Sequence, residues 1–109
     1  MDFVVGLLMA AIRLLIADDS AEMRRDLRMI LALEQDIQIV ALARDGAEAI
    51  ELAARTRPDV AVMDLDMPRV NGLAAIRSIR EKSPGTVCLV LSAEEERGFV
   101  QQAMKSGAR

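Results

Sequence analysis

Hydrophobic and polar residues follow two different patterns along the chain. Four short runs are apolar almost throughout, which is typical of strands buried on both faces. Between and after these runs, apolar residues recur every three or four positions, which is typical of amphipathic helices. The predicted strands are Ile12–Ala17, Ile37–Ala43, Val60–Asp64 and Thr86–Ser92. The predicted helices are Ser20–Glu34, Asp45–Arg57, Asn71–Ser83 and Glu94–Gly107.

Residues at the ends of the predicted helices carry start and stop signals. Ser20 and Asp45 are of the types that cap helix N-termini, whereas Pro58 ends the second helix and Gly107 the fourth. Two helices have clear apolar stripes, and the stripe of the third helix is predicted to face the core. The stripe residues are Met23, Leu27, Ile30 and Leu31 in the first helix, and Leu73, Ile76 and Ile79 in the third.

Strands that are apolar throughout and alternate with helices predict a parallel sheet with helices on both faces. With 109 residues, of which 52% are hydrophobic, the chain is long enough for one domain with one core. The predicted fold is therefore a doubly wound α/β sheet.

Composition excludes several classes of function. The net charge is -3 and Arg is intermixed with Glu, so we expect no basic face for nucleic acid and no polybasic membrane anchor. The chain has no histidine, which excludes imidazole metal sites, Ser-His-Asp triads and a phosphohistidine carried by the chain itself. Its one cysteine, Cys88, cannot form an internal disulfide, is expected to be buried, and fits a reducing cytosol.

Residues 1–10 form an apolar segment that is too short to span a bilayer. Asp2 precedes the apolar run, where a secretory signal peptide needs Lys or Arg, so a signal peptide is weakly supported. Met9 lies shortly before the first predicted strand, in a position suited to the first residue of the domain. Residues 1–10 are therefore interpreted as a leader or extension, and residues 11–109 as the domain.

Carboxylates follow two of the predicted strands, and a hydroxyl follows a third. In parallel sheets, ligands bind beyond the carboxyl ends of the strands, where Asp18 and Asp19, Asp64 and Ser92 are expected to meet. Two carboxylates about 5 Å apart repel by roughly 3 kcal/mol at an effective dielectric of about 20, so a cation is expected there, and Mg²⁺ suits such oxygen ligands. Taken singly, Asp18 and Asp19 read as solvated residues at a helix start, Ser92 as a strand-end or cap residue and Asp66 as a loop residue. Asp64, at the end of a buried run, favours a functional role by itself, and together these residues predict a site.

The stretches LLIADDS, VMDLDMPRVNG and LVLSA, in this order and with helices between them, resemble the receiver domain of two-component response regulators. The resemblance runs from about Ile12 to the end of the chain and implies a flavodoxin-like fold. It implies that Asp64 is the phosphoacceptor and that the Ser92 hydroxyl hydrogen-bonds the phosphoryl group. The Mg²⁺ ligands that it implies are Asp18, Asp19, Asp64 and the backbone carbonyl of Asp66.

The same resemblance implies partners and a signalling cycle. The phosphoryl group would come from a sensor histidine kinase in a cytoplasmic phosphorelay, and the chain would catalyse only its own phosphorylation and dephosphorylation. Phosphorylation is expected to switch the region of the helix Glu94–Lys105. An output domain or partner beyond Arg109, and a dimer through that helix or through the strand Thr86–Ser92, are further expectations. Gly72 is expected to allow a tight turn into the third helix.

The sequence departs from the family at its C-terminal end. Receivers have a fifth strand with a lysine that pairs with the phosphoryl group, and then a fifth helix, whereas this chain stops at KSGAR. Lys105 lies in the fourth predicted helix and does not fill that position, and the edge of the fourth strand is expected to be unpaired. Two alternatives stay open: a degenerate receiver-like interaction module without phosphotransfer, and a phosphatase with an aspartate nucleophile. Pro68, and the position of the motif on the third strand, disfavour the phosphatase.

Overall fold

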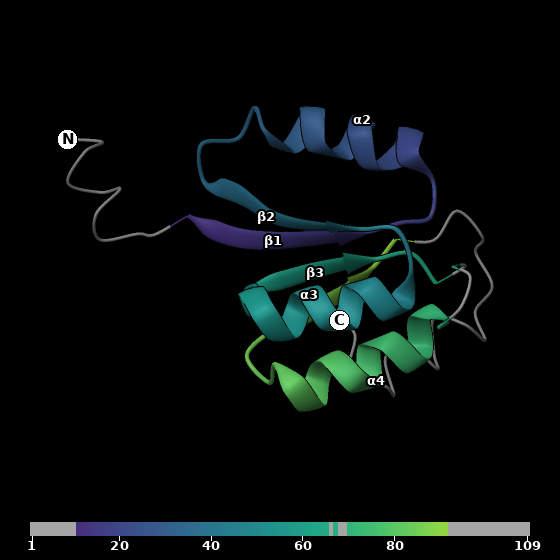
Figure 1. Ribbon diagram of the computed structural model, residues 1–109. Coiled ribbons are helices and arrows are strands. Elements are labelled where there is room, and N and C mark those ends of the chain that lie inside the picture. Colours follow the sequence, from purple (N-terminus) through teal and green to yellow (C-terminus); the bar gives the residue numbers. More distant parts are fainter. Residues whose placement is uncertain (1–10, 66, 68–69, 92–109) are drawn as a thin grey trace.

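A computed structural model describes residues 11–65, 67 and 70–91. Its elements are β1 (Ile12–Ala17), α2 (Ala21–Leu31), β2 (Ile37–Ala43), α3 (Gly46–Thr56), β3 (Val60–Met63), α4 (Gly72–Lys82) and β4 (Val87–Val90). The strands form one parallel sheet in the order β2-β1-β3-β4. α2 lies over one face of this sheet, and α3 and α4 lie over the other (Figure 1). The predicted doubly wound α/β fold is confirmed, and the helix predicted from Glu94 lies outside the described residues.

Side-chain caps confirm the predicted starts of the first two helices. Ser20 and Asp45 each accept a hydrogen bond from the amide of the third helical residue, at 3.1 Å and 2.8 Å. Arg57 ends α3 in a left-handed conformation, with φ 46°, directly before Pro58. Each of these helices has 11 residues, and none in the described part of the chain is long and apolar enough to cross a membrane.

The two faces of the sheet are packed unequally. Under α3 and α4 the core is closed, and Met63, Ile76 and Ile79 have no exposed surface. On the other face α2 has no fully buried residue, and two residues of its predicted apolar stripe, Met23 and Ile30, are 47% and 62% exposed. A stripe is buried only where neighbours cover it, and α2 is the one helix on this face among the described residues.

β4 forms an edge of the sheet among the described strands. It pairs with β3 on one side, and Leu89 and Leu91 near this edge are 40% and 52% exposed. The observed strand Val87–Val90 is shorter than the predicted strand, which ran to Ser92, a residue outside the described ranges.

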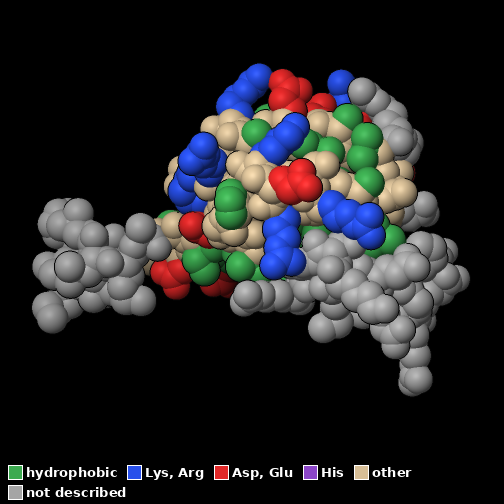
Figure 2. All heavy atoms as spheres, turned by 90° about the horizontal axis from the view of Figure 1, so that it is seen from below, with side chains coloured by type: hydrophobic (Ala, Val, Ile, Leu, Met, Phe, Trp, Pro, Cys, Tyr) green, Lys and Arg blue, Asp and Glu red, His purple; other side chains and the backbone are tan. Residues whose placement is uncertain are grey.

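The outer surface of α3 and α4 carries charges of both signs. Figure 2 shows Lys and Arg side chains over this surface with Asp and Glu side chains among them. Within α3, the Arg55 guanidinium lies 2.9 Å from the Glu51 carboxylate, and both side chains are largely exposed. Such pairs contribute little stability, about 0–1 kcal/mol. The surface in this view therefore carries no single sign of charge.

Two buried hydroxyls connect the turns that lead into β3 and β4. The Thr86 hydroxyl donates to the Pro58 carbonyl oxygen at 2.6 Å. Since its proton is used there, the Ser83 hydroxyl, 2.7 Å away, donates to the Thr86 oxygen. Ser83 and Thr86 are only 3% and 7% exposed, so water has little access to replace these bonds.

We expect Thr86→Val to lower the free energy of unfolding by about 1–3 kcal/mol, because it deprives the buried Pro58 carbonyl and Ser83 hydroxyl of their partner. Thr56→Val is the matched control. The Thr56 hydroxyl also donates to a carbonyl oxygen, that of Leu52, but this bond lies within α3 and supplements the helical hydrogen bonds. Urea denaturation of both variants measures the difference, and equal losses would contradict a special role for the buried pair.

Cys88 is buried in β4 as expected, and this burial raises the pKa of its thiol from the ordinary value of 9.0 to about 11. Between these two pH values the folded state keeps a proton that the unfolded state has lost. The stability that this thiol contributes is therefore complete below pH 9.0 and is lost as the pH rises to about 11, by about 2–3 kcal/mol. Denaturation measured across this range should show the loss in the parent chain and not in Cys88→Ala; identical pH profiles would contradict it.

Candidate functional site

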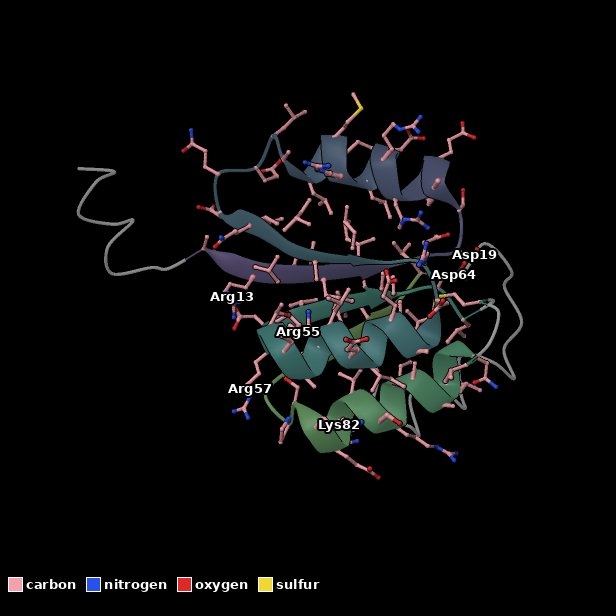
Figure 3. All side chains as sticks on the ribbon, viewed as in Figure 1. Arg13, Asp19, Arg55, Arg57, Asp64 and Lys82 are labelled. Carbon is pink, nitrogen blue, oxygen red and sulfur yellow. The ribbon has the colours of Figure 1, made fainter. Side chains whose placement is uncertain are left out.

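Three carboxylates meet at the carboxyl edge of the sheet. Asp18 and Asp19 directly follow β1, and Asp64 directly follows β3, the neighbour of β1. One carboxylate oxygen of each residue lies within 4.8 Å of the other two. Figure 3 shows Asp19 and Asp64 at this edge. Asp19 is exposed, whereas Asp18 and Asp64 are half-buried, so the cluster is open to solvent on the Asp19 side.

Backbone hydrogen bonds of the sheet fix these positions. The Asp64 amide donates to the Ala17 carbonyl oxygen at 2.9 Å, and the Asp18 amide donates to the Ala43 carbonyl oxygen at 3.0 Å. The pairing therefore continues one residue past the end of β1 toward β2 and one residue past the end of β3 toward β1. Asp18 and Asp64 are held by the rigid sheet, and not by a loop alone.

Asp18 has two further contacts near the start of α2. Its carboxylate accepts a hydrogen bond from the Ser20 amide at 2.9 Å, and its carbonyl oxygen accepts one from the Arg24 guanidinium at 2.6 Å. Sequence reasoning missed Arg24. Its position in the sequence was the available signal. A cation near a helix N-terminus interacts unfavourably with the helix dipole, so a compensating interaction is expected there.

Gly72, the first residue of α4, packs directly on the backbone beside Asp64. Its amide donates to the Leu65 carbonyl oxygen at 3.2 Å. A Cβ at this position would lie 2.6 Å from the Leu65 Cα and 2.7 Å from the Asp64 carbonyl oxygen. Glycine is therefore needed here because two backbone segments approach each other closely. The sequence predicted a different reason, a tight turn into the helix.

Four of the described cationic residues lie toward the opposite edge of the sheet, where the Asp59 carboxylate also lies and accepts a hydrogen bond from the Arg13 amide. Arg13, Arg55, Arg57 and Lys82 lie there, far from Asp19 and Asp64 (Figure 3). α3 and α4 end at that edge, where cations complement helix C-termini, and begin at the acidic edge (Figure 1). The all-oxygen donor set at the acidic edge fits a hard divalent cation such as Mg²⁺.

Of the five residues assigned to the site from the sequence, three meet in the structure. The other two, Asp66 and Ser92, lie outside the described residues, so their assigned contacts stay predictions.

Comparison with known proteins agrees with this arrangement. Residues 14–109 match the response regulator receiver domain family. The chain is 42% identical over 98 residues to a protein-glutamate methylesterase/protein-glutamine glutaminase of Thermotoga maritima, and 38% identical over 97 residues to transcriptional regulatory protein DegU of Brevibacillus brevis. The response regulator domain of Thermotoga maritima CheB superposes with a TM-score of 0.85 at 39% identity, over 90% of this chain and 74% of that one.

The two relatives are much longer than the matched part. Each alignment covers 89% of this chain but only 28% of the methylesterase and 41% of the DegU protein. The chain therefore spans less than half the length of either relative. Because the names of the two proteins describe different activities, the match bears on the shared domain and leaves the activity of any remaining part unassigned.

Proposed function

The chain belongs to the response regulator receiver domain family, and from this premise we propose that Asp64 accepts a phosphoryl group from a sensor histidine kinase in a Mg²⁺-dependent reaction. The observation that carries the proposal is the meeting of the Asp18, Asp19 and Asp64 carboxylate oxygens within 4.8 Å. Receiver domains are phosphoacceptor signalling domains, and this cluster supplies both a nucleophile and ligands for a cation.

The chemical step gives Asp64 a different task from Asp18 and Asp19. An Asp64 oxygen attacks the phosphorus of the donor, and an O–P bond forms while the bond from phosphorus to the imidazole nitrogen of phosphohistidine breaks. The electron pair leaves with the nitrogen, which takes a proton from solvent, and the product is an acyl phosphate on Asp64. Asp18 and Asp19 would hold the cation, together with the backbone carbonyl of Asp66. When bound, Mg²⁺ supplies positive charge that offsets the charge of the phosphoryl oxygens.

The response to phosphorylation is assigned to the segment after β4. The Ser92 hydroxyl would donate to a phosphoryl oxygen, and the added charge would bias the region from Glu94 onward between two arrangements. In this proposal residues 11–109 act as the receiver unit of a cytoplasmic regulator, with the output made by a further domain or by a partner, including a second copy of the chain.

The test is the intact mass of the protein after incubation with a small acyl phosphate or phosphoramidate, with and without Mg²⁺. We expect a gain of one phosphoryl group that requires Mg²⁺ and is removed by hydroxylamine, which cleaves acyl phosphates. An aryl phosphate ester serves as the control for phosphatase activity, and no turnover of it is expected. A folded protein that gains no phosphoryl group would overturn the proposal and favour an interaction module instead.

A further inference from the structure

The N-terminus of α3 packs on the backbone of the segment that follows Asp64. A Cβ at Gly46, the first residue of α3, would overlap the Val70 carbonyl oxygen and lie 2.8 Å from the Val70 carbonyl carbon. Cβ atoms do not approach other heavy atoms this closely, and the atoms in the way are backbone. Alanine has the higher helix propensity, so glycine here reflects the close contact and not the needs of the helix.

The contact reaches Asp64 through Gly72. Two residues beyond Val70, the Gly72 amide is hydrogen-bonded to the Leu65 carbonyl oxygen at 3.2 Å. Gly72 also leaves no room for a Cβ against the Asp64 carbonyl oxygen, at 2.7 Å. Val70 and Gly72 therefore lie between the start of α3 on one side and the backbone of Asp64 and Leu65 on the other. A displacement of Val70 would therefore be transmitted through the backbone of Gly72 to Asp64, the proposed phosphoacceptor.

The same turn is joined to the second carboxylate segment. β2 ends at Ala43, whose carbonyl oxygen accepts a hydrogen bond from the Asp18 amide at 3.0 Å. Three residues later comes Gly46, preceded by the helix cap Asp45, which is only 4% exposed and accepts a hydrogen bond from the Glu48 amide at 2.8 Å. The connection from β2 to α3 thus contacts both the Asp18 and the Asp64 sides of the cluster.

From these contacts we infer that Gly46 is a positioning residue for the acidic site, an inference that rests on the proposed function. It touches neither the cation nor the phosphoryl group. Its missing side chain lets the start of α3 lie against Val70 and so brace, through Gly72, the backbone of Asp64, while Ala43 at the end of β2 holds Asp18.

Gly46→Ala tests this inference, and Gly85→Ala is the matched control because a Cβ at Gly85 has nothing within 4 Å. Amide NMR spectra of the metal-free chain report displacement of Asp64 and Leu65. Titration with Mg²⁺ alone gives the dissociation constant, and thermal unfolding gives stability. We expect Gly46→Ala to shift these two amides and to weaken Mg²⁺ binding about tenfold or more. Gly85→Ala should do neither.

A purely structural role predicts a different result, because lost stability lowers the folded fraction without changing the dissociation constant of the folded protein. Unmoved Asp64 and Leu65 amides, or an unchanged Mg²⁺ dissociation constant in folded Gly46→Ala, would overturn the inference. If Gly46→Ala does not fold, Val70→Gly removes the Val70 Cβ from this contact and frees the Val70 backbone without a clash, and should still weaken Mg²⁺ binding. Failure of the proposed function is recognised separately, because the parent chain itself would then bind no Mg²⁺ and accept no phosphoryl group.

Discussion

Asp64→Asn should abolish phosphoryl acceptance while leaving the sheet intact. The carboxamide that replaces the carboxylate is neutral and a poor nucleophile, so we expect the rate to fall by a factor on the order of 10⁴ or more, as in other deletions of a nucleophile. The substitution also removes one of three like charges that lie within 4.8 Å of one another. The free energy of unfolding without metal should therefore not decrease, because charge repulsion is relieved.

Asp59→Asn is the matched control for this prediction. Asp59 directly precedes β3, whereas Asp64 directly follows it, so both variants make the same chemical change at opposite ends of one strand. The Asp59 carboxylate accepts a hydrogen bond from the Arg13 amide at 2.9 Å, which a carboxamide oxygen can also accept. Intact mass after incubation with the phosphodonor should show acceptance in Asp59→Asn only. A Mg²⁺-dependent phosphoryl group on Asp64→Asn would place the acceptor elsewhere.

The meeting of the three aspartates could be predicted because it depends on topology. Strands that are apolar throughout indicate a parallel sheet, and all strands of such a sheet end at the same edge. Asp18 and Asp64 then need only belong to neighbouring strands, which β1 and β3 are. The helix starts at Ser20 and Asp45 were predictable for a similar reason, since a cap is a local contact between residues three apart.

The close contacts around the site could not be predicted in this way. Gly46 lies in α3 and Val70 in the connection before α4, and only the packed structure shows that they touch. The exposure of the α2 stripe also depends on contacts that a local pattern does not contain. Periodicity identifies which side of a helix is apolar, but the burial of Met23 and Ile30 depends on what else lies on that face of the sheet.

Ile76→Ala should lower the free energy of unfolding by about 2–5 kcal/mol. Ile76 lies in α4 with no exposed surface and belongs to the core cluster that includes Met63 and Ile79. Truncation removes apolar contacts and leaves a cavity that a closed core cannot fully collapse. Because small domains are stable by only about 5–15 kcal/mol, a loss of this size is readily measured by chemical denaturation.

Ile30→Ala makes the same change in α2, where the side chain is 62% exposed. Little apolar surface is lost there and alanine is the better helix former, so we expect a change within about 0.5 kcal/mol. Equal losses in both variants would show that α2 is covered in solution and would contradict the unequal packing of the two faces. The expected difference has a consequence for the site. α3 and α4 begin with Gly46 and Gly72, so the face that supplies most of the stability also positions the Asp64 backbone.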